Sequence, residues 1–191
     1  MRYFEWDNPY EKNNCALSGF EGGEFQEMTK AKPLAKLRPD PYTYSMDEEY
    51  KKNVRLTDSL INDQRTIVAS ERLRDLLLSR LGKKIEALPV WIKDHKGRIA
   101  SKSYAIINIL DVQPCLATDE SEPIFTTIGG KNTLVGVDNL TLNAKKISQD
   151  AMLFRTAELL GPILIREDLA DEIGAGKFVG MRFLPVNTIS R

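Results

Sequence analysis

The apolar positions of the chain form the same pattern twice. Thr66–Val90 and Pro162–Val186 align without a gap at an offset of 96, and seven of their 25 positions are identical, including a closing Leu-Pro-Val. Each stretch begins with a short apolar run, TIVA or PILI, of the kind found in buried strands. A run with helical spacing follows, and an apolar segment closes the stretch. The pattern predicts a strand–helix–strand unit that occurs twice, at about 66–90 and 162–186.

The first unit carries clear signals for the two ends of its helix. Ser70 precedes the run ERLRDLLLSRL and offers a side-chain oxygen as N-cap, and Gly82 follows the run as a C-cap. Proline in the closing strand of each unit has no N–H to donate, so it should lie at a strand edge, start or bulge.

The second unit is shorter and has a less regular helical run. Leu169 and Ile173 define one apolar face of its helix. We expect the two helices to begin within about two residues of Glu71 and Glu167, with Leu73 and Leu169 buried. Chance similarity between two ordinary strand–helix–strand units is the alternative interpretation.

The remaining segments predict further strands and few helices. The run IFTTIGG and the run TLVGVDNLTLN should be two strands joined at a Gly-Gly turn. Towards the N-terminus we expect an opening strand in MRYFEWD, a long irregular connection over 19–44, and a short surface helix near 46–55 started by Ser45 and Glu48. We also expect a hairpin that turns at KDHKG and returns over Tyr104–Leu110. A strand at Met152–Arg155 should be followed by a short turn of helix.

These elements together predict an α+β fold. We expect a mixed, mostly antiparallel sheet with few helices that contains the two similar units. We expect residues 1–65 to form a partly irregular N-terminal segment that packs on a main domain, 66–191.

Composition narrows the class of protein. Hydrophobic residues make up 42% of the 191 residues and charged residues 28%, which is ordinary for a globular protein. Lys and Arg total 27, as do Asp and Glu, so there is no basic excess of the kind that nucleic-acid binders show. No run approaches the ~20 apolar residues that span a membrane. The N-terminus lacks an apolar signal region, so we expect a cytoplasmic protein whose two cysteines, Cys15 and Cys115, are not bonded to each other.

Catalytic signals are scarce. The single histidine, His95, lies in a predicted turn beside Gly97, where we expect it to be solvated. The Gly-Gly pairs lack the Lys-Ser/Thr of a phosphate-binding loop and the spacing of a dinucleotide fingerprint. The sequence therefore predicts no catalytic residue, no metal site and no cofactor.

One long stretch is distinctive in its charge. Residues 103–130 contain no Lys or Arg but four acids, Asp111, Asp119, Glu120 and Glu122. The run ATDESE lacks the glycine and the ligand spacing of an EF-hand, so a metal-binding loop is one interpretation and a solvated loop another. A third is an acidic patch that fills a basic cleft on another protein, where charge complementarity selects the partner.

Four segments, taken in order, resemble a known family. They are VASERLRDLL, YAIINILDVQPCLATDES, LTLNAKKISQDAMLFRT and PILIREDLADEIGAGKFVGMRFLPV. Together they resemble the immunity proteins of bacterial polymorphic-toxin systems with a myxobacterial prototype, over roughly Thr66–Val186. This resemblance implies a non-enzymatic protein that binds and neutralises a cognate toxin or effector domain, encoded by a neighbouring gene, in the cytoplasm.

The resemblance supplies no contact residues, so the candidate binding residues come from this sequence alone. They are the acids Asp111, Asp119, Glu120 and Glu122, with the hairpin tip Lys93–Arg98, which carries His95, as the second candidate.

Two other classes stay open. One is a small-molecule-binding or hydrolytic enzyme with a site between the repeated units that uses acids such as Asp111 and Glu122. The other is a structural module of a larger secretion or phage particle. The sequence leaves the oligomeric state open.

Overall fold

The structure is a computed structural model that describes residues 1–23, 27, 29–35 and 41–190. Within these residues it has 15 strands and two α-helices, and antiparallel strand pairs outnumber parallel ones, so the predicted α+β class is confirmed. The chain forms two compact units. Unit 1 comprises Met1–Trp6, Asp111–Glu172 and Phe183–Arg191, and unit 2 comprises Asp7–Leu110 and Ile173–Arg182. The predicted division into an N-terminal segment, 1–65, and a main domain, 66–191, stays a prediction, because the two compact units do not test it.

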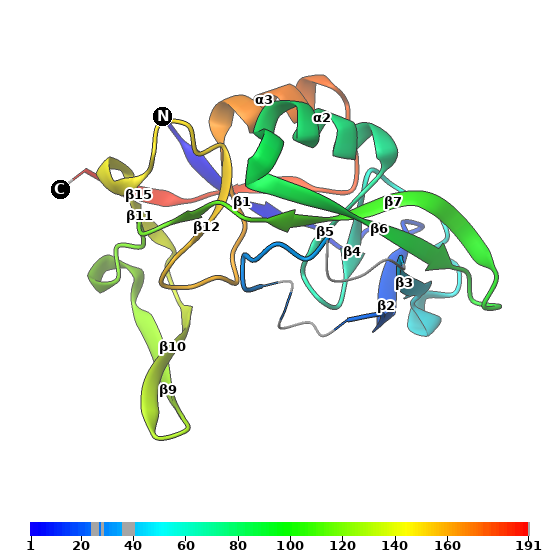
Figure 1. Cartoon of the computed structure of the whole chain (residues 1–191), viewed down its shortest axis with the longest axis horizontal. Helices are drawn as coiled ribbons and strands as arrows, with labels where there is room; N and C mark the ends of the chain where they lie inside the picture. The colour runs from blue at the N-terminus through cyan, green and yellow to red at the C-terminus, as the bar shows by residue number, and fades with distance from the viewer. Residues whose placement is uncertain (24–26, 28, 36–40, 191) are drawn as a thin grey trace. The chain divides into compact units, whose positions relative to one another are not determined.

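Unit 2 is built around a closed six-stranded barrel (Figure 1). Apolar side chains from its strands meet in one core, in which Tyr44, Leu60 and Val90 are fully buried. The strands, in the order in which they neighbour one another, are β2 (Ala16–Glu21), β3 (Tyr42–Met46), β6 (Ile85–Lys93), β7 (Ile99–Ile109), β5 (Ile67–Ala69) and β4 (Ser59–Asn62).

The first predicted strand–helix–strand unit lies in this barrel. Strands β5 and β6 each pair antiparallel with β7, one on either side of it, and α2 (Glu71–Leu81) connects them. The Ser70 side chain accepts the N–H of Leu73 at 3.4 Å, and Gly82 follows the helix with φ +52°, so both predicted ends are confirmed. Pro89 precedes Val90, where β3 begins to pair with β6, as expected of a residue without an N–H.

A buried carboxylate fixes the start of α2 within unit 2. Asp58 accepts hydrogen bonds from the Ser70 hydroxyl at 2.8 Å, the Arg72 guanidinium at 2.7 Å and the Val179 N–H at 3.0 Å. The Arg72 guanidinium also stacks over the Phe178 ring, 4.0 Å from its centre. Burial opposes ionisation of Asp58, but these donors outweigh it and hold its pKa below the usual value.

The opening strand of the second predicted unit, the start of its helix and most of its closing strand belong to unit 1, whereas residues 173–182 belong to unit 2. The five-stranded sheet of unit 1 has the order β14 (Arg182–Pro185), β1 (Tyr3–Asp7), β13 (Leu164–Arg166), β12 (Leu153–Thr156) and β8 (Val112–Gln113). Helix α3 (Glu167–Ala175) follows β13 directly and starts at the expected residue, and Leu169 is fully buried. In each copy, a strand from outside the copy lies between the copy's two strands. This strand is β7 between β5 and β6 in the first copy, and β1 between β13 and β14 in the second.

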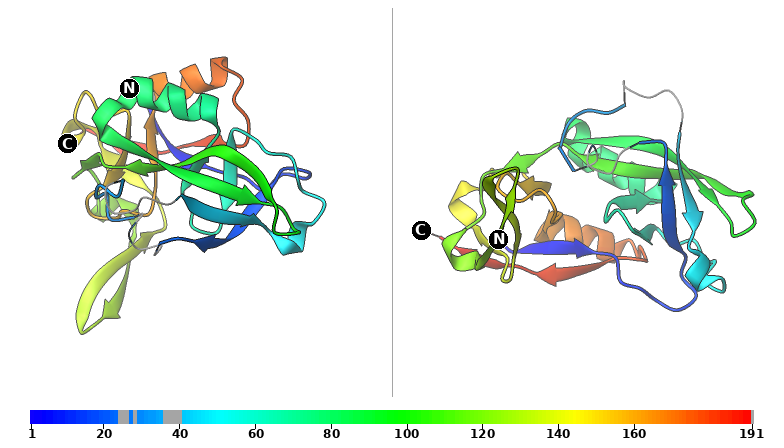
Figure 2. Two further views of the ribbon diagram at one scale, coloured as in Figure 1. Left: turned by 45° about the vertical axis from the view of Figure 1, so that its right-hand side comes forward. Right: turned by 90° about the horizontal axis from the view of Figure 1, so that it is seen from below.

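Two smaller sheets complete unit 1. Strand β9 (Pro123–Ile128) pairs with β10 (Lys131–Val137) across the predicted Gly-Gly turn. Strand β11 (Thr141–Asn143), which we expected to continue β10, is separate from it and pairs in parallel with β15 (Asn187–Ile189). The β9–β10 hairpin projects from the rest of unit 1 in Figures 1 and 2.

The helix predicted near 46–55 is wrong. Ser45, expected to start it, lies in β3, whose side chains alternate between buried and half-buried over Tyr42–Met46. Burying this alternating face in the barrel outweighs the local capping signal. Only a short 3₁₀ helix, Glu48–Tyr50, forms, and Asp47 rather than Ser45 caps it.

The turn of helix expected after Met152–Arg155 is also absent: residues 157–163 follow β12 as bends and irregular chain. The buried Arg155 guanidinium donates to the carbonyl oxygens of Leu160 and Gly161, and Thr156 Oγ accepts the N–H of Leu159 at 3.1 Å. These bonds pair two carbonyl groups and one N–H of the loop that a helix would otherwise have to pair.

The irregular connection expected over 19–44 holds only in part. Strand β2 reaches Glu21 and β3 begins at Tyr42, so both ends of this range belong to the barrel. Leu34 is buried, and its N–H donates to the Glu86 carboxylate at 2.7 Å. Residues 24–26, 28 and 36–40 of the range lie outside the described residues.

The two cysteines are free and buried, as predicted. Cys15 lies in the core of unit 2 and Cys115 in that of unit 1. Burial raises the pKa of each thiol to about 12.

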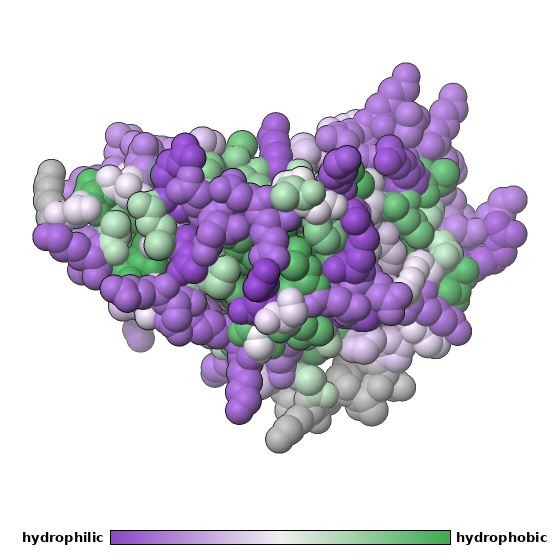
Figure 3. All heavy atoms as spheres, turned by 90° about the horizontal axis from the view of Figure 1, so that it is seen from above, coloured by the Kyte–Doolittle hydropathy of each residue, from purple (hydrophilic) through white to green (hydrophobic). Residues whose placement is uncertain are grey.

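On the face of the molecule in Figure 3, hydrophilic side chains predominate, and hydrophobic ones form small groups between them.

Candidate functional site

The acidic segment of unit 1 is held by a short 3₁₀ turn, Asp119–Ser121. Ser121 is fully buried, and its hydroxyl donates to the carbonyl of Ala117 at 2.7 Å and accepts the N–H of Thr141 at 3.1 Å. The N–H of Glu120 also donates to the carbonyl of Ala117, at 3.2 Å. The turn that carries the acids is therefore fixed to β11 by its one buried side chain.

The acids around Ser121 differ in exposure. Asp119 and Glu122 are exposed, and Glu120 is half-buried. Glu122 has φ +50°, a left-handed backbone conformation that is uncommon for a residue with a side chain. The chain reverses direction there, and the N–H of Asp138 donates to the Glu122 carbonyl at 3.2 Å. We call Asp119, Glu120, Glu122 and Asp138 the acidic collar, because they lie at the base of the β9–β10 hairpin.

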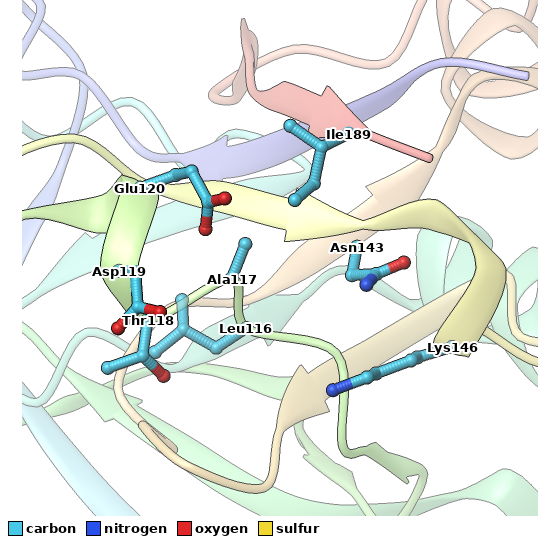
Figure 4. A pocket seen from close by; sticks show the side chains of 8 residues that line it. All are labelled: Leu116, Ala117, Thr118, Asp119, Glu120, Asn143, Lys146 and Ile189. Atoms are coloured by element: carbon cyan, nitrogen blue, oxygen red, sulfur yellow. The ribbon is translucent and has the colours of Figure 1, made fainter. Parts of the chain in front are cut away.

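A pocket of about 380 Å³ lies beside this turn (Figure 4). The Asp119 and Glu120 side chains lie on one side of it, and Lys146 reaches in from another. Both signs of charge thus face one recess, which suits it to charged or polar groups of a ligand or of another protein. Its lining residues are Leu116, Ala117, Thr118, Asp119, Glu120, Asn143, Lys146 and Ile189.

Sequence reasoning missed the far side of this pocket. Asn143 caps the 3₁₀ turn that leads to Lys146 by accepting the N–H of Lys145 at 3.2 Å, and Asn before Ala-Lys-Lys is a local signal of such a cap. Ile189 reaches the pocket through the pairing of β15 with β11, for which the sequence has no local signal.

Asp111 and Glu122 are not among the residues that line the pocket. The Asp111 side chain accepts a hydrogen bond from the Gln113 amide, and its backbone carbonyl accepts the N–H of Arg155 at 3.0 Å. The structure therefore joins Asp119 and Glu120 in one recess and places Asp111 in the connection between β7 and β8.

His95 belongs to unit 2, whereas the four acids belong to unit 1. His95 lies in the turn between β6 and β7, where that turn was predicted, but the expected solvation holds only in part, because the residue is half-buried. A ring nitrogen lies 3.1 Å from the carbonyl oxygen of Asp47, beside the 3₁₀ helix that replaces the expected surface helix. Hydrogen bonds from Arg98 hold the pKa of Asp94 in the same turn at about 2.

The described residues contain neither a metal-binding cluster nor a membrane-spanning helix. Among residues 1–23, 27, 29–35 and 41–190, no group of three or more His, Cys, Asp or Glu side chains is arranged to hold a metal ion. In the same ranges, neither helix is long and apolar enough to cross a membrane.

Comparison with known proteins identifies the family. The model of the immunity protein family Imm11 matches residues 17–188, nearly the whole chain. The chain therefore belongs to the Imm11 immunity protein family. The match begins well before Thr66, so the barrel strands β2, β3 and β4 belong to it as well. Comparison with curated proteins gives no significant match.

Proposed function

We propose that this chain binds a cognate bacterial toxin or effector domain in the cytoplasm and neutralises it by occupying its surface, without catalysing a reaction. The observation that carries this proposal is the family match over residues 17–188. The partner is expected to be encoded by the gene next to that of this chain.

The acidic turn is the surface that we propose for this contact. Asp119 and Glu122 are exposed, and the hydrogen bonds of Ser121 fix the backbone turn that carries them before a toxin binds. A pre-ordered charged surface loses less conformational entropy on binding and steers association with a basic cleft. Asp111 adds negative charge to unit 1. The tip Lys93–Arg98 with His95 is the second candidate contact.

The test uses the C-terminal domain encoded by the adjacent gene. We expect that co-expression of the wild-type chain restores growth of bacterial cells that produce this domain, and that a catalytically inactive form of it co-purifies with the chain. The triple change Asp119→Ala, Glu120→Ala, Glu122→Ala should reduce affinity and flatten its dependence on salt, because charge pairs that are desolvated at an interface cost ~2–5 kcal/mol when one partner is removed.

A matched control removes the same charge from unit 2. Glu48, Glu49 and Asp63 are exposed acids, and replacing all three by Ala should leave affinity and protection unchanged. Full protection by the acidic-turn variant, with unchanged salt dependence, would reject the acidic turn as the contact. Failure of the wild-type chain to bind or protect would reject the proposed function.

A further inference from the structure

The β9–β10 hairpin stands apart from the sheet of unit 1 as a two-stranded ribbon (Figures 1 and 2). Ile128 pairs with Lys131 across Gly129 and Gly130, whose φ values of +58° and +79° suit a tight two-residue turn. A two-stranded ribbon with no layer packed against it is marginally stable in water. Packing against the core therefore does not explain why the chain has this projecting hairpin, and binding to another molecule is a possible reason.

The hairpin exposes apolar side chains on both of its faces. The exposed fractions are 44% for Ile124, 48% for Phe125, 58% for Ile128 and 46% for Val135. Successive side chains of a strand point to opposite faces, so Ile124 and Ile128 share one face and Phe125 lies on the other, where it pairs with Leu134. Clustered exposed apolar residues mark interaction sites. Because both faces carry exposed apolar side chains, a partner that encloses the hairpin covers more of them than one that lies flat against it.

The base of the hairpin is negatively charged. The acidic collar supplies four carboxylates, and the only basic residue between 119 and 138 is Lys131 at the tip. The collar is continuous in structure with the hairpin, because Asp138 bonds to Glu122 where the two strands meet unit 1. A complementary partner therefore offers an apolar cleft with a basic rim.

The outer edge of β10 is poorly suited to recognition by strand addition. The pairing of β9 and β10 shifts register between Leu134 and Gly136, so Val135 forms a bulge. Bulges disrupt the regular row of backbone donors and acceptors that an added strand needs. Recognition through side chains agrees with this geometry.

We propose that the β9–β10 hairpin inserts into a cleft of the toxin domain that has apolar walls and a basic rim, and that the acidic collar pairs with this rim. This inference rests on the proposed function and adds to it the apolar contact that anchors the complex. A second copy of this chain would offer another acidic collar in place of a basic rim, which disfavours it as the occupant.

The experiment compares two double variants in the full chain. Phe125→Ser with Ile128→Ser removes the two most exposed of the four apolar side chains of the hairpin, one from each face. Val54→Ser with Ile99→Ser removes two apolar side chains of similar exposure from unit 2. The probe is the inactive C-terminal domain encoded by the adjacent gene, and binding is measured by calorimetry. We expect the hairpin variant to lose ~10-fold or more in affinity and the control to lose less than ~3-fold.

The salt series separates the two contacts. The hairpin variant should bind more weakly with an unchanged dependence on salt, whereas the acidic-turn variant should alter that dependence. Because all four side chains are exposed, the melting temperatures of both variants should stay close to that of the wild type, which shows that a loss of binding is not a loss of folding.

Three outcomes would overturn the proposal. If the wild type binds and the hairpin variant binds equally well, the hairpin is not the anchor, while the proposed function stands. If sedimentation shows a wild-type dimer that the hairpin variant dissociates, the occupant is a second copy. If the wild type does not bind the probe, both the proposed function and this inference fail.

Discussion

The two Leu-Pro-Val segments have the same sequence, but their leucine and valine side chains differ in exposure. In β6, Leu88 is 2% exposed and Val90 is fully buried. At the end of the second copy, Leu184 is 37% exposed and Val186 is half-buried. The difference comes from their neighbours, because β6 lies between β3 and β7 in a closed barrel, whereas β14 is a four-residue strand at one end of the unit 1 sheet. The repeated sequence pattern thus gives the same strand arrangement in both copies. How far its side chains are buried depends on the strands that surround each copy.

The largest expected effect tests this difference directly. Leu88→Ala should lower the free energy of unfolding by ~2–5 kcal/mol, because it leaves a cavity in the barrel core. Leu184→Ala should lower it by less than ~1 kcal/mol, because a large part of that side chain is already in water. Urea unfolding of the two variants gives both values, and equal costs would contradict the assignment of exposure.

A second comparison concerns what anchors the start of each helix. Asp58→Asn should cost ~1.5–3 kcal/mol, because the buried Asp58 carboxylate accepts three kinds of donor, including the Arg72 guanidinium. At the start of α3, Glu167 pairs with the exposed Arg2, where solvent screens the interaction, so Glu167→Gln should cost less than Asp58→Asn. Urea unfolding of the two variants gives this order.

The Asp58 anchor also predicts a dependence on pH. Its pKa is lower in the folded chain than in the unfolded chain, so its stabilisation is present above the unfolded value of ~3.9 and is lost as the pH falls through the folded value. Melting temperatures measured between about pH 6 and pH 2 should therefore fall more steeply for the wild type than for Asp58→Asn. If the melting temperatures of the wild type and of Asp58→Asn fall in parallel with pH, Asp58 does not cause the pH dependence of stability.

The smallest expected effect has opposite signs in the two copies. Gly82→Ala, after α2, should destabilise by ~1 kcal/mol, because φ +52° strains a residue with a side chain although an added Cβ meets no atom within 4 Å. Gly174→Ala lies inside α3, is exposed and has equal space around it, so it should stabilise by up to ~1 kcal/mol. Thermal unfolding of both variants measures the difference, and the same sign for both would show that backbone conformation does not explain it.

Local signals allowed the sequence to predict the two strand–helix–strand units. Ser70 and Gly82 mark the ends of α2 whatever surrounds it, and the Gly-Gly pair marks the turn between β9 and β10. The surface helix near 46–55 failed because the barrel selected the alternating face of β3 over the capping signal of Ser45. Tertiary burial outweighs local preference where the two disagree.

The candidate site was predicted only in part, for the same reason. Asp119 and Glu120 stand out in a stretch without basic residues, whereas Lys146 and Ile189 reach the pocket through contacts between distant segments. The exposure of Ile124 and Phe125 was equally hidden, because PIFTTI has the composition of a buried strand. Apolar residues that stay exposed to water can be recognised only from the fold, because the sequence does not show that no other element packs on them.

The two free cysteines give the molecule a natural pair of reporters. Each compact unit holds one thiol in its own core, and a thiol that is shielded and has a pKa near 12 barely reacts until its surroundings open. Labelling rates at neutral pH, resolved by peptide mapping, therefore follow the opening of each core separately, with no substitution introduced. A common rate for Cys15 and Cys115 would mean that the two cores open as one cooperative unit, whereas distinct rates would rank their local stabilities.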